Sequence, residues 1–211
     1  MQLEPANPST IVNAQAGVTA VVLAAGQSDR MGDQFKLIAP FRGKLIIRHV
    51  CEAVAASKAT SVVVVTGHRA DEVRQALDGI DVQITRNPEY SSGLSTSLRA
   101  GVRALPAQTT ACLVVLGDMP LIKPETIDRL IQAFHDADGP VICVPMCDSR
   151  RGNPVLWSTE FFDALTRIEG DQGARSLIAE NSDSVVEVMV DDDGVLIDID
   201  TRETLEALRS L

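Results

Sequence analysis

The sequence is poor in several features that would place a protein in a special class. Only 3% of its 211 residues are aromatic, and no apolar run approaches the roughly 18 residues that a membrane span needs. The N-terminal stretch lacks the basic and apolar segments of a secretory signal peptide. We therefore expect a cytoplasmic protein with no membrane partner.

Cysteine is also scarce, with four in the chain. Only Cys143 and Cys147 are close in sequence, and neither a second pair nor a histidine follows them. A structural zinc ion needs four converging ligands. The cysteines are therefore expected to be buried, reduced thiols.

Positive charge is in the minority. The chain has 19 basic and 29 acidic side chains, which gives a net charge of −10. Nucleic-acid binding needs a basic face, so nucleic acid is not expected as a partner. An anionic substrate would require a local site, assisted by a metal ion. The hydrophobic and charged contents, 45% and 23%, are those of a globular protein with its own core.

The pattern along the chain predicts a flexible N-terminal arm over residues 1–17 and one domain over residues 18–211. Within this domain apolar runs alternate with amphipathic segments. Strands are expected at 18–24, 61–66, 82–85, 111–116, 141–145 and 153–157. Helices are expected at 44–57, 70–77, 94–105, 124–135, 158–166, 173–180 and 201–211. Residues 185–190 and 195–199 are expected to form a hairpin around Asp193-Gly194. The acidic run 191–194 is expected to be a solvated turn rather than a metal site.

Alternating strands and helices predict an α/β fold, a doubly wound, mostly parallel sheet with helices on both faces. Ligands of such sheets bind beyond the carboxyl ends of the strands. This rule selects the loops at 25–36, 86–97 and 117–123 as the candidate site.

The first of these loops has glycines and basic residues but no standard phosphate-binding motif. Gly26 and Gly32 are six residues apart, which differs from both the Walker and the dinucleotide-binding patterns. Backbone N–H groups of such a loop can hold phosphate oxygens, and Arg30 and Lys36 can add positive charge. The spacing alone also fits an ordinary loop with solvated basic residues.

The same region reads Leu23-Ala24-Ala25-Gly26-x-Ser28-x-Arg30-Met31-Gly32-x3-Lys36-Leu37. Later blocks follow in order: Asn87-Pro88-x4-Gly93-x3-Ser97-Leu98, Gly117-Asp118-Met119-Pro120, Arg151-Gly152-Asn153-Pro154, Gly170-Asp171-x-Gly173-Ala174-Arg175 and Asp198-Ile199-Asp200-Thr201. Together they resemble the motifs of nucleotidyltransferases related to molybdenum cofactor biosynthesis, and among these most closely the molybdenum cofactor cytidylyltransferases. The guanylyltransferases of that group open instead on a Leu-Ala-Gly-Gly pattern.

This resemblance implies a Rossmann-like nucleotidyltransferase that moves an NMP from an NTP to a phosphorylated acceptor and releases pyrophosphate. It implies Mg²⁺ as cofactor, CTP as the favoured nucleotide, molybdopterin as acceptor, and a molybdoenzyme or its chaperone as a protein partner. The alternatives are a GTP-using or sugar-phosphate enzyme of the same fold, and a non-catalytic nucleotide- or cofactor-binding module.

The resemblance also implies roles for individual residues. Arg30, Lys36 and Asp118 are the expected catalytic residues, with Asp118 also a metal ligand. Asp200 is expected either as a second metal ligand or as the N-cap of the last helix. The nucleotide-binding set is Leu23, Ala24, Ala25, Gly26, Arg30, Lys36, Asn87, Gly93 and Ser97. Without the resemblance, Asp118 and Asn87 would equally fit simple turn residues.

Overall fold

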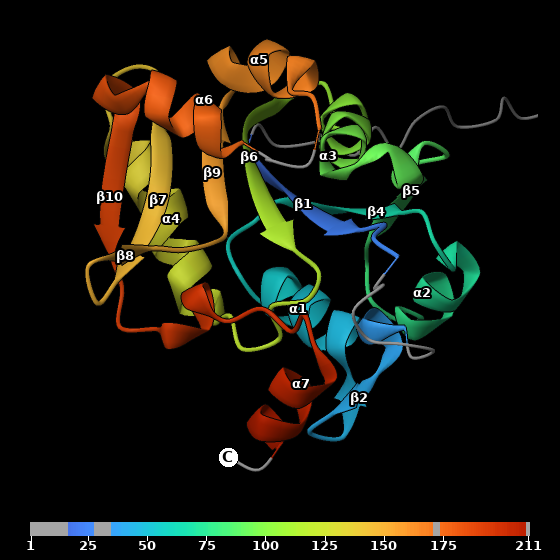
Figure 1. The fold of residues 1–211 in the computed structure, drawn as a ribbon. Coiled ribbons are helices and arrows are strands. Elements are labelled where there is room, and N and C mark those ends of the chain that lie inside the picture. The colour runs from blue at the N-terminus through green and yellow to red at the C-terminus, as the bar shows by residue number, and fades with distance from the viewer. Residues whose placement is uncertain (1–16, 28–34, 171–173, 210–211) are drawn as a thin grey trace, which may run out of the picture.

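The computed structural model describes residues 17–27, 35–170 and 174–209 (Figure 1). The predicted arm therefore lies outside the described residues except for Gly17, which is the first residue of a strand. No helix among the described residues is long and apolar enough to cross a membrane. The four cysteines are all buried and free.

The centre of the molecule is a mixed, mostly parallel sheet. Its strands lie in the order β10-β7-β9-β6-β1-β4-β5, and the short β8 pairs with β7. All neighbours in this order are parallel except that β9 is antiparallel to β6 and β7. The strands are β1 (Gly17–Ala24), β4 (Ser61–Thr66), β5 (Gln83–Arg86), β6 (Thr109–Leu116), β7 (Ile142–Cys147), β8 (Arg150–Arg151), β9 (Val155–Ser158) and β10 (Val185–Met189). The predicted doubly wound fold is confirmed.

Helices cover both faces of this sheet. Apolar side chains of α1 (Ile46–Ala55), α2 (Ala70–Ala76) and α4 (Pro124–Asp136) pack on one face. The other face is covered by α3 (Leu94–Arg103), α5 (Phe162–Arg167) and α6 (Arg175–Glu180). In Figure 1, α3 and α5 lie above the sheet and α1 below it.

The central strand β1 shows why its sequence folds this way. Its side chains alternate between the two faces, and every residue is buried. A continuous valine-rich run suits a strand that helices cover on both sides. Gly101 lets α3 approach closely, because a Cβ there would lie 2.3 Å from Cγ1 of Val21.

Smaller elements complete the carboxyl edge of the sheet. A hairpin of β2 (Pro40–Phe41) and β3 (Lys44–Leu45) packs with the C-terminal helix α7 (Arg202–Arg209) in a separate apolar cluster. The 3-10 helices are η2 (Lys36–Ile38), η3 (Tyr90–Ser92), η4 (Thr159–Phe161), η5 (Ser182–Ser184) and η6 (Asp193–Leu196).

The predicted hairpin near the C-terminus is wrong. Residues 185–189 form β10, which pairs in parallel with β7, and η6 stands where the second hairpin strand was expected. The acidic turn is solvated only in part, because Asp191 and Asp193 are exposed whereas Asp192 is 3% exposed. Its carboxylate accepts hydrogen bonds from Thr126 Oγ1 at 2.6 Å and from the backbone N–H groups of Lys123 and Gly194. Asp192 thus joins this turn to the start of α4.

Candidate active site

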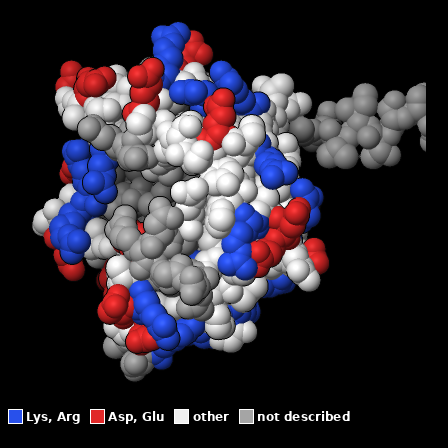
Figure 2. All heavy atoms as spheres, turned by 45° about the vertical axis from the view of Figure 1, so that its right-hand side comes forward, with Lys and Arg blue, Asp and Glu red and all other residues white. Residues whose placement is uncertain are grey.

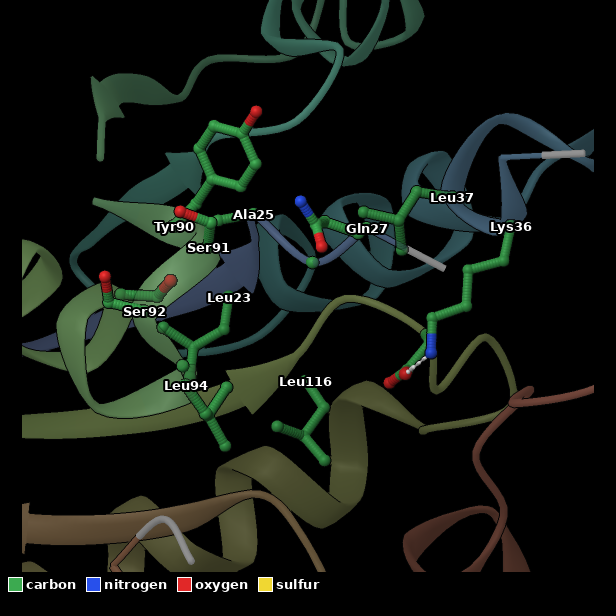
Figure 3. A pocket seen from close by; sticks show the side chains of 14 residues that line it. Leu23, Ala25, Gln27, Lys36, Leu37, Tyr90, Ser91, Ser92, Leu94 and Leu116 are labelled. Carbon is green, nitrogen blue, oxygen red and sulfur yellow. Dashed lines mark hydrogen bonds and ion pairs between the residues drawn. The ribbon is translucent and has the colours of Figure 1, made fainter. Parts of the chain in front are cut away.

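A cavity of about 550 Å³ opens at the carboxyl ends of β1 and β6, where the fold class predicts a ligand. Figure 3 shows Leu23, Leu94 and Leu116 together on one wall and Lys36 reaching in from the opposite side. The remaining lining residues are Ala25, Gly26, Gln27, Leu37, Tyr90, Ser91, Ser92, Gly93, Ser97 and Asp118. The cavity is large enough for a small-molecule ligand.

Glycines shape the backbone around this cavity. Gly93 has a φ of 106°, a conformation that side chains rarely adopt, and α3 begins directly after it. A Cβ at Gly26 would meet no atom within 4 Å, so the backbone there faces open space. A Cβ at Gly67 would lie 2.5 Å from Cβ of Tyr90, so this glycine lets the η3 segment pack against the β4 end.

Asn87 holds the loop that forms one side of the cavity. Its side chain is buried, and its Nδ2 donates to Thr96 Oγ1 at 2.8 Å and to Ser97 Oγ at 3.1 Å. Its Oδ1 accepts from the backbone N–H of Glu89 at 2.9 Å. Asn87 does not line the cavity itself, so it positions Ser97, which does.

Three carboxylates meet at the edge of the cavity. Asp118 follows β6, and Asp198 and Asp200 lie in the segment before α7. One oxygen from each lies within 4.8 Å of the others. The segment is fixed because the N–H of Ile199 donates to the carbonyl of Asp118 at 2.9 Å while the Ile199 side chain is fully buried. Residues two apart on an extended segment share a side, so both flanking carboxylates reach Asp118.

Lys36 is the cation of this group. Its Nζ lies 2.5 Å from Asp118 Oδ2, a contact that Figure 3 draws as a dashed line from Lys36. The same Nζ lies 2.9 Å from Asp200 Oδ1. Burial opposes a charged lysine, yet its two carboxylate partners raise the pKa of Lys36 above its ordinary value. Burial raises the pKa of Asp118, and the attraction of Lys36 opposes this rise. Both side chains are therefore poorly solvated, and each stabilises the charged form of the other.

The carboxylate cluster fits a hard divalent cation. Oδ1 of Asp118 is buried and has no hydrogen-bond partner in the part of the chain that the structure describes. A buried oxygen without a partner is costly. One oxygen each from Asp118, Asp198 and Asp200 offers the kind of carboxylate ligand that Mg²⁺ and Mn²⁺ prefer. Lys36 balances only one of the three negative charges.

The two expectations for Asp200 can now be separated. The hydroxyl of Thr201 accepts from the backbone N–H of Thr204 at 3.2 Å, and α7 begins at Arg202. Thr201 is therefore the N-cap. The carboxylate of Asp200 instead lies beside Lys36 in the cluster.

The structure brings most of the predicted site residues together. Ala24 is buried behind the cavity wall, and Arg30 lies outside the described residues. The cavity is lined by the following members of the predicted set: Leu23, Ala25, Gly26, Lys36, Gly93, Ser97 and Asp118. Sequence reasoning missed Asp198 as a candidate ligand and Tyr90 as a lining residue. The alternation of acidic residues in Asp198-Ile199-Asp200 was the available signal for the first.

A second cavity, of about 380 Å³, adjoins the first. Leu23, Leu94 and Leu116 line both cavities, and Asp198 and Asp200 line the second. The carboxylate cluster therefore lies between two cavities. Two ligands, one in each cavity, would therefore meet at the carboxylate cluster.

Comparisons with known proteins agree with this geometry. A family model described as the MobA-like NTP transferase domain matches residues 20–185. A nucleotidyl transferase from Methanothermobacter thermautotroptrophicus superposes with a TM-score of 0.81 at 27% identity, covering 93% of this chain and 97% of that one. Rv0371c of Mycobacterium tuberculosis H37Rv, in complex with manganese, superposes with a TM-score of 0.76 at 26% identity, covering 93% and 99%.

Two curated relatives show different activities on related sequences. The bifunctional protein GlmU of Sorangium cellulosum is 33% identical over 77% of this chain, which spans only 35% of its length. The nicotine blue oxidoreductase of Paenarthrobacter nicotinovorans is 28% identical over 90% of this chain and 96% of its own.

Proposed function

Because the chain belongs to the MobA-like NTP transferase family, we propose that it is a nucleotidyltransferase that moves CMP from CTP to molybdopterin. In this reaction an oxygen of the acceptor's phosphate forms a bond to the α-phosphorus of the nucleotide. The bond from that phosphorus to the leaving pyrophosphate breaks, and pyrophosphate is released. The proposed cofactor is Mg²⁺, and the proposed setting is the cytoplasm.

The observation that carries this proposal is the position of the carboxylate cluster with Lys36. Phosphoryl-group transfer depends on positioning and charge neutralisation more than on covalent chemistry by the protein. Lys36 supplies a buried positive charge at the mouth of the first cavity, and the three carboxylates offer metal ligands beside it. A module that only binds a nucleotide or cofactor, the second alternative, would have no obvious use for such a set.

Each part of the site has a role in this scheme. The backbone from Leu23 to Gln27 and the loop before α3 would hold base, ribose and phosphates. Asp118, Asp198 and Asp200 would hold Mg²⁺, which when bound supplies positive charge to the phosphate oxygens. Lys36 would leave part of its carboxylate pairing and neutralise charge on the triphosphate, an electrostatic contribution of a preorganised site. Arg30 is proposed to share this role.

The choice of CTP over GTP rests on the sequence pattern Leu23-Ala24-Ala25-Gly26 and on the Gly93–Leu98 segment. A site that hydrogen-bonds a base discriminates because the wrong base leaves buried groups unpaired. CTP should therefore have the higher kcat/KM. Equal values for the two nucleotides would reject the cytidylyl assignment but leave nucleotidyl transfer intact.

The decisive experiment is the mass of the product after incubation with Mg²⁺, CTP and molybdopterin. We expect the acceptor mass to increase by one CMP and pyrophosphate to appear in equal amount. Asp118→Asn is the control, since it keeps the shape of the side chain and removes a metal-binding charge. The same panel with GTP and with a sugar phosphate tests the alternatives. Absence of pyrophosphate with every nucleotide and acceptor would overturn the proposal.

A further inference from the structure

Leu94 is an apolar side chain that the fold leaves exposed at the candidate active site. Its exposed fraction is 38%, whereas that of the neighbouring Leu23 is 8%. Among the described residues, the other exposed large apolar side chains are Val186 and Met189, and both lie on the edge strand β10. Single exposures of this kind are common on protein surfaces. Leu94 differs from them because it lines both the first and the second cavity.

The start of α3 holds Leu94 in this position. Gly93, with its φ of 106°, turns the chain into the helix, and Leu94 is the first helical residue. The three residues that follow are buried. The N–H of Ser95 donates to the carbonyl of Gly170 at 3.3 Å, and the hydroxyl of Thr96 donates to the carbonyl of Gly93 at 2.8 Å. The anchored neighbours therefore keep the Leu94 side chain at the cavities although it is only partly buried.

Three leucines form the boundary between the two cavities. Leu23, Leu94 and Leu116 line both cavities, and Figure 3 shows them side by side. Asp118 lines the first cavity and Asp200 lines the second, so the carboxylate cluster lies next to this boundary. A ligand in one cavity therefore meets a ligand in the other beside the leucines and the carboxylates.

Water competes with the acceptor in the proposed reaction. Its oxygen would form a bond to the α-phosphorus of CTP, the bond to the leaving pyrophosphate would break, and a proton would pass to the solvent. The products would be CMP and pyrophosphate. A nucleophile of this kind must be held in line with the leaving group. A leucine side chain has no hydrogen-bonding group with which to hold water, unlike the basic and acidic side chains spread over much of the surface in Figure 2.

We infer that Leu94 is a specificity-determining residue that favours the acceptor over water as the nucleophile. Its side chain fills space at the boundary and offers no hydrogen bond there, so water is neither admitted nor oriented for attack. This inference rests on the proposed function and deepens it, because it assigns the suppression of CTP hydrolysis to one residue. It concerns the choice of nucleophile, and it is independent of the chemical identity of the acceptor.

The test follows CTP in the absence of an acceptor. The protein is incubated with Mg²⁺ and CTP in water enriched in the heavy oxygen isotope, and the products are quantified by mass spectrometry. Label in CMP reports attack at the α-phosphorus, whereas label in pyrophosphate reports attack at the β-phosphorus. We expect wild type to form labelled CMP slowly. Leu94→Ala should form it at least about tenfold faster, because the shortened side chain admits water at the boundary.

Three further variants separate water exclusion from general damage to the site. Leu94→Met keeps the apolar bulk and should hydrolyse CTP as slowly as wild type. Leu94→Asn is close to leucine in size but adds an amide that can orient water, so it should resemble Leu94→Ala. The control is Met189→Ala, which removes an exposed apolar side chain that lines neither cavity, and it should not accelerate hydrolysis. All four variants should melt close to wild type, because the altered side chains are exposed.

The same variants are then supplied with molybdopterin. Leu94→Ala should divide CTP between transfer and hydrolysis, whereas wild type and Leu94→Met should give mainly transfer. A purely structural role of Leu94 would lower both rates together and leave this ratio unchanged.

The outcomes separate this inference from the proposed function. Equal hydrolysis by Leu94→Ala and Met189→Ala, equal acceleration by Leu94→Met, or label in pyrophosphate would overturn the inference, while transfer by wild type would still support the transferase. Faster labelling of CMP by Leu94→Ala without transfer to any acceptor would support the role of Leu94 and count against the proposed function. Neither hydrolysis nor transfer by wild type and all variants would overturn both.

Discussion

Replacing Lys36 with methionine should destabilise the metal-free protein and make it depend on a divalent cation. Lys36 pairs with Asp118 and Asp200, and its side chain is only 14% exposed. Methionine keeps most of the aliphatic volume but removes the charge. Three carboxylates with oxygens within 4.8 Å of one another would then lose the ammonium group that pairs with two of them. The sequence alone predicts a tolerated change, since a loop lysine has no core to support.

The size of the effect follows from burial. Breaking a fully buried ion pair costs about 3–5 kcal/mol, whereas an exposed pair contributes about 0–1 kcal/mol. The side chains of Lys36 and Asp118 are 14% and 15% exposed, and that of Asp200 is 34% exposed. We therefore expect a loss of about 1–3 kcal/mol, which corresponds to roughly 3–10 °C in melting temperature for a chain of this size.

Thermal melting with and without Mg²⁺ or Mn²⁺ tests this reasoning. A cation that binds only the folded state at a hundred times its Kd stabilises by about 2.7 kcal/mol, so it should restore most of the loss in Lys36→Met. Wild-type protein should gain less, because the cation displaces Lys36 from its partners. The control is Lys44→Met, since the Lys44–Glu52 pair is more exposed. Equal melting temperatures of Lys36→Met and wild type, or equal gains on adding metal, would refute the argument.

Three further predictions concern single positions. Burial raises the pKa of Asp118 above its ordinary value of 3.8, so the folded state binds that proton more tightly and wild-type stability falls as the pH rises through the raised pKa. Asp118→Asn lacks this proton, so its melting temperature should rise relative to that of wild type as the pH increases from below 3.8 to neutral. Added metal should no longer stabilise this variant. Asp200→Asn should weaken Mg²⁺ binding at unchanged metal-free stability, whereas Thr201→Val should cost about 1 kcal/mol in unfolding experiments and leave Mg²⁺ affinity alone. Gly101→Ala should destabilise the fold by about 1–3 kcal/mol, because α3 must move away from β1. Gly26→Ala should melt like wild type, because a Cβ there meets open space. If Gly26→Ala were the less stable variant, the packing described here would be contradicted.

The main architecture could be predicted because its signals are local. Strands such as β1 and β4 are valine-rich and mostly apolar, and α4 shows both a proline in its first turn and an apolar stripe. The C-terminal hairpin could not be predicted correctly, because pairing is a property of the whole sheet. The β10 strand pairs with β7, some forty residues away in sequence, and no local sequence pattern specifies this pairing.

The same distinction applies to the site. Lys36 and Asp118 stand beside recognisable glycine and proline patterns, so the sequence could place both in the candidate site, and both line the first cavity. Only the structure shows that Asp192 and Asp198 have different environments. Both belong to acidic stretches, yet Asp192 is buried against the N-terminus of α4 and Asp198 joins the carboxylate cluster. Sequence alone cannot tell a capping carboxylate from a metal-binding one, because the difference is the identity of the distant partner.

The C-terminal segment has a consequence for how the site is assembled. The family match ends at residue 185, and two of the three clustered carboxylates, Asp198 and Asp200, lie beyond it. They reach the cluster because Ile199 is buried between them, together with Leu205 of α7 and Phe41 of the β2–β3 hairpin. The N–H of Ile199 then fixes the register by donating to Asp118. The packing of α7 therefore sets the position of Asp198 and Asp200, so the C-terminal helix shapes the carboxylate cluster through apolar contacts made away from either cavity.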